Sequence, residues 1–296
     1  MTLEYRFQEM SFIAIIGAGP TGGAIAHKVA ARDRIGEVRL IDDDERIAAG
    51  KALDIVQSGP VEGFSTRVIA SSAIASAAGA AAIVLADQAG GQGEHAGEGA
   101  LALLRKLSKL EGRAPIVLAG ANQLDLVSRA VSELHINASR LLGSAPFAIE
   151  SALRALTGLA VDASGAQISL TVVGVPPHAA VVAWEEATAF GQPLSSQLAA
   201  HTIAALSARI PGLWPPGPYA LASAATRVVE AIVNGSRRRF SCFVALGPGK
   251  AATMPVELGE DGVLRIIEPT LTRQEQTRLD TAISYQTSAI SRQPKN

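Results

Sequence analysis

The sequence predicts an α/β protein in which a parallel sheet covered by helices on both faces is followed by a smaller α+β unit. Short β-branched runs alternate with Ala-rich helical runs through the first half of the 296-residue chain, as in βαβ units. After about Ser144 this rhythm gives way to helices and a meander of short strands. Hydrophobic residues make up 48% and charged residues 18% of the chain, a globular balance with enough apolar material for two cores.

The first half is expected to hold the parallel sheet. Residues 12–16 form an apolar run without polar alternation, which is typical of a strand buried on both faces. Further strands are predicted at residues 37–41, 66–70, 81–86 and 115–119. The predicted helices are residues 21–32, 44–57, 98–110 and 123–134. This spacing implies right-handed crossovers that place helices on both faces of a doubly wound sheet.

The second half is expected to be an α+β domain with antiparallel strands. Its predicted helices are residues 149–157, 195–209, 219–234 and 272–288. Its predicted strands are residues 168–173, 240–245, 254–258 and 263–267. Residues 260–262 read Glu-Asp-Gly and predict a hairpin turn, since Asp-Gly supplies the positive φ angles that such a turn needs. We place the domain boundary between residues 146 and 147, so that the domains are 1–146 and 147–296.

Composition narrows the class of protein. The net charge of −1 argues against nucleic acid or an anionic membrane as the main partner. The single cysteine, Cys242, excludes an internal disulfide, disfavours secretion and makes a zinc site unexpected. No signal peptide is visible, and the uncharged stretch 68–86 is too rich in Ala, Ser and Gly for a membrane span. These features predict a cytoplasmic protein without a metal centre.

A glycine-rich turn follows the first strand. Residues 17–23 read Gly-Ala-Gly-Pro-Thr-Gly-Gly and match G-x-G-x-x-G between a strand and a helix. Gly17 allows the tight turn, Gly19 lets the backbone approach a pyrophosphate, and Gly22 lets the helix pack against the strand. The helix N-terminus would offer unpaired N–H groups to the phosphates. The pattern predicts a Rossmann-type dinucleotide site.

The predicted cofactor is NAD. Asp42 ends the second strand, near the position where the fingerprint expects an acid. Its carboxylate would accept hydrogen bonds from the adenosine ribose and would repel the 2′-phosphate of NADP. The other expected cofactor contacts are Pro20 and Thr21 at the start of the helix, Ala86 after a later strand, and Asn122.

Several stretches resemble the lactate/malate dehydrogenase family. Residues 13–64 carry the likeness most strongly, above all the segment Gly-Lys-Ala-Leu-Asp-Ile at 50–55. Residues 121–125 resemble the family's Asn-Pro-Val-Asp loop, residues 225–232 its late substrate-domain helix, and residues 255–268 its C-terminal hairpin. The resemblance implies an NAD-binding domain, a substrate domain for a small molecule of unknown identity, an active site between them, and a homodimer or homotetramer.

The family's substrate clamp is not found in this sequence. The family binds the substrate carboxylate with arginines, because a guanidinium holds a carboxylate bidentately. The mobile loop normally carries two of them, but no arginine lies between Arg67 and Arg105, and the aligned positions are near Gly91 and Gly97. In the segment that resembles the family's Asp-x-x-Arg helix, Leu153 occupies the arginine's place. The segment that aligns with the mobile loop, residues 86–98, is acidic and rich in glycine. An acidic loop repels an oxo acid.

The proton-transfer groups are also altered. Glu150 resembles the acid that orients the family's catalytic histidine, but the ungapped register puts Pro176 at the histidine position. A two-residue slip would restore His178 and would misplace Trp184. Asn122 matches an asparagine that hydrogen-bonds near the nicotinamide and the substrate carbonyl in the family. The candidate catalytic residues are therefore His178, Glu150 and Asn122, with His95 as an alternative in proton transfer.

Two functions agree with this pattern. The first is an NAD-dependent oxidoreductase of the family with altered or weak activity on 2-hydroxy and 2-oxo acids. The second is a non-catalytic NAD-binding homologue that acts as a sensor or partner subunit. A missing acid/base group costs about 10²–10⁴ in rate, and each charged hydrogen bond lost from a clamp costs about 1.5–3 kcal/mol. Little ordinary malate or lactate turnover is expected in either case.

Overall fold

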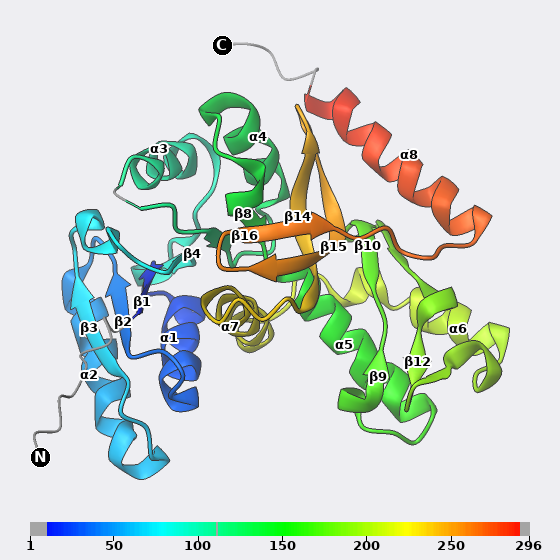
Figure 1. Cartoon of the computed structure of the whole chain (residues 1–296), viewed down its shortest axis with the longest axis horizontal. Coiled ribbons are helices and arrows are strands. Elements are labelled where there is room, and N and C mark those ends of the chain that lie inside the picture. The colour runs from blue at the N-terminus through cyan, green and yellow to red at the C-terminus, as the bar shows by residue number, and fades with distance from the viewer. Residues whose placement is uncertain (1–10, 111, 291–296) are drawn as a thin grey trace, which may run out of the picture.

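The computed structural model describes residues 11–110 and 112–290, and a mixed sheet runs through both halves of the chain (Figure 1). Its parallel part consists of β1 (Phe12–Ile16), β2 (Glu37–Ile41), β3 (Arg67–Ser71), β4 (Ala82–Leu85), β7 (Ile116–Leu118) and β8 (Leu141–Gly143). Its antiparallel part consists of β10 (Val172–Val175), β11 (Ala179–Val182), β14 (Arg239–Gly247), β15 (Lys250–Gly259) and β16 (Gly262–Ile266). The strand order is β11-β10-β15-β14-β8-β7-β4-β1-β2-β3, with β16 beside β15.

Two small sheets stand apart from the main one. The first is a hairpin of β5 (Asp87–Gln88) and β6 (Gly93–Glu94). The second contains β9 (Ile168–Ser169), β12 (Thr188–Ala189) and β13 (Gln192–Pro193). Neither hairpin β5–β6 nor strand β8 was among the predicted strands, because β5 and β6 are short polar segments and β8 contains no β-branched residue.

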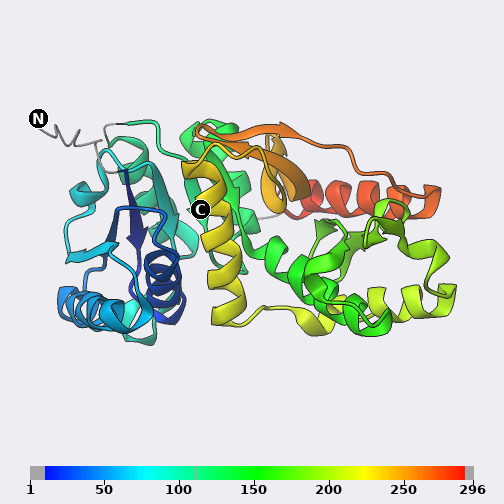
Figure 2. The same ribbon diagram turned by 60° about the horizontal axis from the view of Figure 1, so that its bottom comes forward.

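The helices flank the main sheet (Figures 1 and 2). They are α1 (Pro20–Arg32), α2 (Glu45–Glu62), α3 (Gly97–Ser108), α4 (Leu124–Leu134), α5 (Ala145–Ala160), α6 (Ala200–Ser207), α7 (Pro218–Val233) and α8 (Arg273–Ile290). Helix α7 lies between the two halves and packs against both α1 and α5 (Figure 2). Within the described part of the chain, no helix is long and apolar enough to cross a bilayer.

Strand β1 is the centre of the parallel sheet and is buried on both faces. Ile13 and Ile15 belong to one core cluster, whereas Ala14 and Ile16 belong to another on the opposite face. This alternation confirms the prediction that the unbroken apolar run is a strand covered by helices on both sides. The α/β fold class, with its antiparallel second half, is confirmed in the same way by the strand pairing.

The two halves share this sheet. The junction is the pairing of Gly143 on β8 with Phe243 on β14. A side chain on Gly143 would meet the Phe243 ring, with its Cβ only 2.7 Å from the ring atom Cδ2. Helix α5 begins at Ala145 and crosses the predicted boundary between residues 146 and 147, and the division into two domains stays a prediction.

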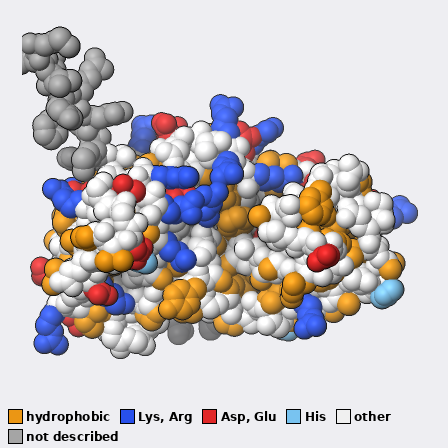
Figure 3. Space-filling view, turned by 90° about the horizontal axis from the view of Figure 1, so that it is seen from below, with side chains coloured by type: hydrophobic (Ala, Val, Ile, Leu, Met, Phe, Trp, Pro, Cys, Tyr) orange, Lys and Arg blue, Asp and Glu red, His pale blue; other side chains and the backbone are white. Residues whose placement is uncertain are grey.

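A cluster of charged groups joins α1 to α7. The Glu230 carboxylate on α7 is nearly inaccessible to solvent, with 5% of its side chain exposed. It pairs with the guanidinium groups of Arg32, Arg34 and Arg227. Figure 3 shows Lys and Arg side chains gathered near the middle of the face seen from below. One buried carboxylate therefore compensates several crowded positive charges where the two halves meet.

We expect Glu230→Gln to destabilise the protein by about 2 kcal/mol. The value is lower than the ~3–5 kcal/mol for breaking a fully buried pair, because the side chains of the three arginines are 31–57% exposed. The matched control is Glu133→Gln, which removes an exposed pair with Arg129 on α4 and should cost less than about 0.5 kcal/mol. Urea denaturation of the three proteins measures both effects, and equal losses in the two variants would contradict the role of Glu230.

Candidate functional site

The predicted phosphate turn has the backbone geometry of an anion-binding site. Gly17 has a φ of +108°, and its N–H donates to the carbonyl of Ile41 at the end of β2. A Cβ on Gly22 would lie 1.9 Å from the Gly17 carbonyl oxygen, so only glycine allows α1 to start this close to β1. Pro20 is the first residue of α1, and Ala86 packs against the turn from the end of β4. The structure therefore brings Gly17, Gly22, Pro20 and Ala86 together at this turn, and their contact with a cofactor stays a prediction.

Asp42 lies beneath the same turn and is 8% exposed. Its Oδ2 accepts hydrogen bonds from the backbone N–H groups of Ala18 (2.7 Å) and Ala89 (2.9 Å). Its Oδ1 accepts one from the N–H of Asp44 (2.9 Å). The carboxylate therefore holds the glycine turn and the segment after β4 in place, and in this conformation it serves the protein's own backbone.

The N–H groups at the start of α1 are also engaged by the chain itself. The Asp87 carboxylate, just after β4, accepts hydrogen bonds from the N–H of Thr21 (3.1 Å) and of Gly22 (2.9 Å). A Cβ on Gly19 would lie 2.5 Å from Asp87 Cγ, so this glycine allows the close approach of the carboxylate. Lys51 from α2 donates to the carbonyl of Gly19 on the other side (2.8 Å). The helix N-terminus thus binds an anion, and that anion is Asp87.

A second carboxylate does the same at the neighbouring crossover. Glu94 accepts hydrogen bonds from the N–H of Ala121 (2.7 Å) and of Asn122 (2.9 Å), in the turn between β7 and α4. The side chain of Gln123 donates to the carbonyl of His95 (3.1 Å) and fixes the same segment. The Asn122 side chain itself is exposed at this turn.

His95 follows Glu94 in the same segment of the chain. Its imidazole lines a cavity of only about 50 Å³. The other residues that line this cavity are Ile16, Gly17, Ile41, Asp42, Asp43, Ile74, Gln88 and Leu103. Its Nε2 is buried and has no hydrogen-bond partner among the described residues. Burial lowers the pKa of His95 below its usual value, against the opposing effect of the carboxylates of Asp42, Asp43 and Asp87.

A dinucleotide does not fit this cleft while residues 87–95 stay in place. A pyrophosphate at the glycine turn needs the N–H groups that the Asp87 carboxylate already occupies. It would also meet the negative charge of Asp87 itself, which is within hydrogen-bond distance of the helix N-terminus. The pocket at the end of β2, where the base of a dinucleotide would be expected, has a volume of only about 50 Å³, enough for a few water molecules beside His95.

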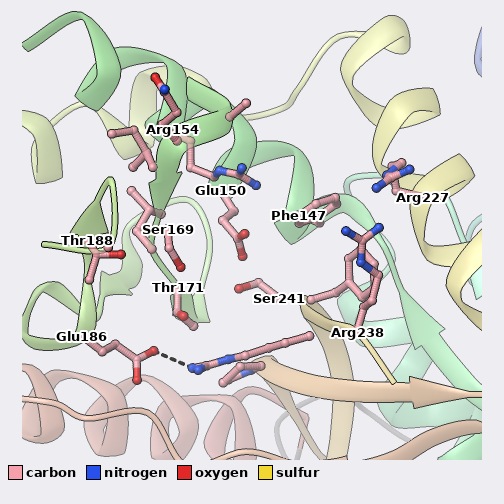
Figure 4. Close-up of a pocket in the computed structure, with 18 residues that line it drawn as sticks. Phe147, Glu150, Arg154, Ser169, Thr171, Glu186, Thr188, Arg227, Arg238 and Ser241 are labelled. Atoms are coloured by element: carbon pink, nitrogen blue, oxygen red, sulfur yellow. Dashed lines mark hydrogen bonds and ion pairs between the residues drawn. The ribbon is translucent and has the colours of Figure 1, made fainter. Parts of the chain in front are cut away.

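A polar cavity lies elsewhere, between α5, α7 and β14 (Figure 4). It has a volume of about 580 Å³ and contains Glu150. In Figure 4 the side chains of Glu150 and Ser241 point toward each other, while Arg227 and Arg238 lie together on one side of Phe147. Glu150 is 8% exposed, and its burial raises its pKa to about 7 against the smaller, opposite effect of hydrogen bonding from Ser241.

The three candidate catalytic residues are not brought into one site. Glu150 faces Ser241 inside the cavity, whereas His178 is exposed on the turn between β10 and β11. Asn122 lies at the β7–α4 turn beside Glu94. Leu153, in the place of the family's clamp arginine, is fully buried in the core of the second half. Across residues 11–110 and 112–290, no group of three or more His, Cys, Asp or Glu side chains is arranged to hold a metal ion.

Sequence reasoning missed Asp87 and Glu94. A signal was present, because a four-residue Gly-Gly loop separates two short polar segments and is typical of a hairpin. That hairpin pairs Asp87 directly with Glu94.

The chain is similar to malate dehydrogenases along nearly its whole length. The chain is 30% identical to a malate dehydrogenase of Chlorobium phaeovibrioides over 91% of this chain and 94% of the relative. It is 27% identical to one of Thermomicrobium roseum over 90% and 93%. No family model matches the chain.

Solved structures share the fold. The lactate dehydrogenase of Cryptosporidium parvum, solved with lactic acid and NAD, superposes with a TM-score of 0.84 at 23% identity over 96% of this chain and 99% of that one. The malate dehydrogenase of Salinibacter ruber gives a TM-score of 0.82 at 23% identity over 95% and 96%.

The raised pKa of Glu150 makes stability depend on pH. Between about pH 4.5, the ordinary pKa of a glutamate, and about pH 7, the Glu150 carboxyl keeps its proton in the folded protein and has lost it in the unfolded chain. The free energy of unfolding should therefore fall as pH rises through this window, by up to about 3 kcal/mol. Glu150→Gln should remove that slope and be more stable than the parent chain at about pH 8. Thermal melts across this range, with exposed Asp261→Asn as the control, measure it, and parallel curves for all three proteins would contradict the assignment.

Proposed function

Because the chain belongs to the lactate/malate dehydrogenase family, we propose that it binds NAD at the α1 turn without reducing 2-oxo acids at the family's ordinary rates. It is a homologue of NAD-dependent 2-hydroxy acid dehydrogenases that acts through binding, as a sensor or partner subunit. Binding requires residues 87–95 to leave the cleft, because they occupy it in the conformation described above.

Support for binding comes from the backbone. The turn at Gly17–Gly22 presents two adjacent N–H groups to an anion at the carboxyl end of β1. This crevice lies where the strand order reverses between β1 and β4, the usual place for a ligand in an open α/β sheet. Asp42 stands at the end of β2, in reach of the same turn. The relative from Cryptosporidium parvum was solved with NAD.

The observation that carries the loss of ordinary turnover is the separation of Glu150 from His178. An acid that orients a catalytic histidine has to contact it. Glu150 instead faces Ser241 within its own cavity, and His178 is exposed on a different turn. A buried leucine, Leu153, stands where a guanidinium would be needed to hold the substrate carboxylate.

A second candidate is an active oxidoreductase with a different substrate. It is favoured by Glu150, whose pKa of about 7 suits a group that transfers protons near neutral pH. The cavity around Glu150 also contains Arg227 and Arg238, which would attract an anionic substrate. Turnover that falls in Glu150→Gln would support this candidate.

We also propose a homodimer or homotetramer located in the cytoplasm. On helix α2, Leu53 and Val56 lie one turn apart on the same face and are 58% and 43% exposed. An exposed apolar helix face is typical of a surface that another chain covers. Light scattering measures the oligomeric state directly.

We expect NADH to bind, and oxaloacetate and pyruvate not to be reduced at ordinary rates. Fluorescence titration measures binding, with displacement by NAD as the control for specificity. NADH oxidation is then followed against a panel of oxo acids, ketones and aldehydes. Turnover of either oxo acid at the ordinary ~1–10³ s⁻¹ would contradict the proposal. The absence of NADH binding at concentrations up to about 1 mM would also contradict it, because a Kd above that value is too weak for a cofactor.

A further inference from the structure

Hairpin β5–β6 presents two carboxylates in the manner of a bound ligand. Asp87 and Glu94 are directly opposed in the hairpin register. Each uses both of its oxygens on two consecutive backbone N–H groups, Asp87 at the start of α1 and Glu94 at the turn before α4. Consecutive N–H groups at the carboxyl end of a parallel sheet are receptors for anions such as phosphate.

His95 extends this arrangement beyond the carboxylates. Its flat ring lies beside Asp42 in the small pocket at the end of β2, with apolar neighbours that include Ile41 and Leu103. A buried ring nitrogen normally has a hydrogen-bond partner, but the buried Nε2 of His95 has none among the described residues. Packing alone therefore does not explain the position of this ring. Together the segment supplies an anion on the glycine turn and a ring in the adjoining pocket, which are the two kinds of group that a nucleotide would place there.

The hairpin has a backbone that depends on glycine. Gly90, Gly91 and Gly93 have φ values of +69°, +77° and +78°. A Cβ at any of the three would meet no atom within 4 Å, so these glycines are needed for backbone conformation and not for packing. A substitution there strains the hairpin without touching the N–H groups that it covers.

We propose that residues 87–95 are a built-in competitor that occupies the dinucleotide cleft and is displaced when a dinucleotide binds. The proposal rests on the proposed function, since competition requires a chain that binds a dinucleotide. The apparent affinity of the cleft for a dinucleotide is then its intrinsic affinity multiplied by the fraction of molecules in which the hairpin is undocked. A change that undocks the hairpin activates the cleft without altering any atom that contacts the dinucleotide.

Two variants undock the hairpin by different means. Asp87→Ala removes the carboxylate from the α1 N-terminus, and Gly91→Ala strains the hairpin while keeping every acid. Each should lower the Kd for NADH by at least about tenfold. This is the factor by which docking of the hairpin weakens when it loses one charge-assisted hydrogen bond at the low end of the usual range. The controls are Asp261→Ala, an exposed acid in the β15–β16 turn, and Gly249→Ala, a glycine at φ +68° with equally open space. Neither control should change the Kd.

Amide hydrogen exchange tests the docked state without any dinucleotide. The N–H groups of Thr21, Gly22, Ala121 and Asn122 should be protected in the parent chain. Thr21 and Gly22 should lose protection in Asp87→Ala, and Ala121 and Asn122 in Glu94→Ala. Protection that is absent from the parent chain, or unchanged in both variants, would overturn the proposal.

The outcomes separate the two proposals. Equal NADH affinity in the parent chain, Asp87→Ala and Gly91→Ala overturns competition alone and leaves the proposed function standing. The absence of NADH binding in every variant overturns the proposed function, and competition with it. Tighter binding in Asp87→Ala with no change in Gly91→Ala also overturns competition, because the effect is then the removal of one negative charge.

Discussion

The hydrogen bonds from Thr21 and Gly22 to the Asp87 carboxylate govern the state of the cleft. A strand, tight turn and helix leave N–H groups unpaired at the helix start, and these groups need a partner. In this chain the partner comes from the end of the neighbouring strand. Gly19 allows it, since a Cβ there would lie 2.7 Å from the Asp87 Oδ2. The glycine spacing that suits a pyrophosphate therefore also suits an internal carboxylate.

The fold could be predicted from sequence because its signals are local. The unbroken apolar run of β1 specifies a strand buried on both faces, and the Asp-Gly pair at 261–262 specifies the β15–β16 hairpin. The continuity of the sheet across Gly143 and Phe243 could not be predicted. It depends on a contact between residues a hundred positions apart, which no periodic pattern records.

The site could be predicted only in part. The positions of Gly17, Gly22 and Asp42 follow from a motif whose geometry is fixed by backbone sterics. The partners of Glu150 could not be predicted, because they depend on how α5 packs against β14, and no local sequence pattern records that contact. The role of Asp87 was missed for a similar reason. The glycine motif predicts free N–H groups at the start of α1, but no local pattern records that a carboxylate 66 positions further along the chain accepts from them.

The central claim is that the hairpin and a dinucleotide exclude each other. A crystal structure of the full chain grown with NADH tests this most directly. In every molecule that contains NADH, the account predicts that the Asp87 carboxylate has left the N–H groups of Thr21 and Gly22, with residues 87–95 moved out of the cleft. NADH bound while Asp87 keeps both hydrogen bonds would contradict the account.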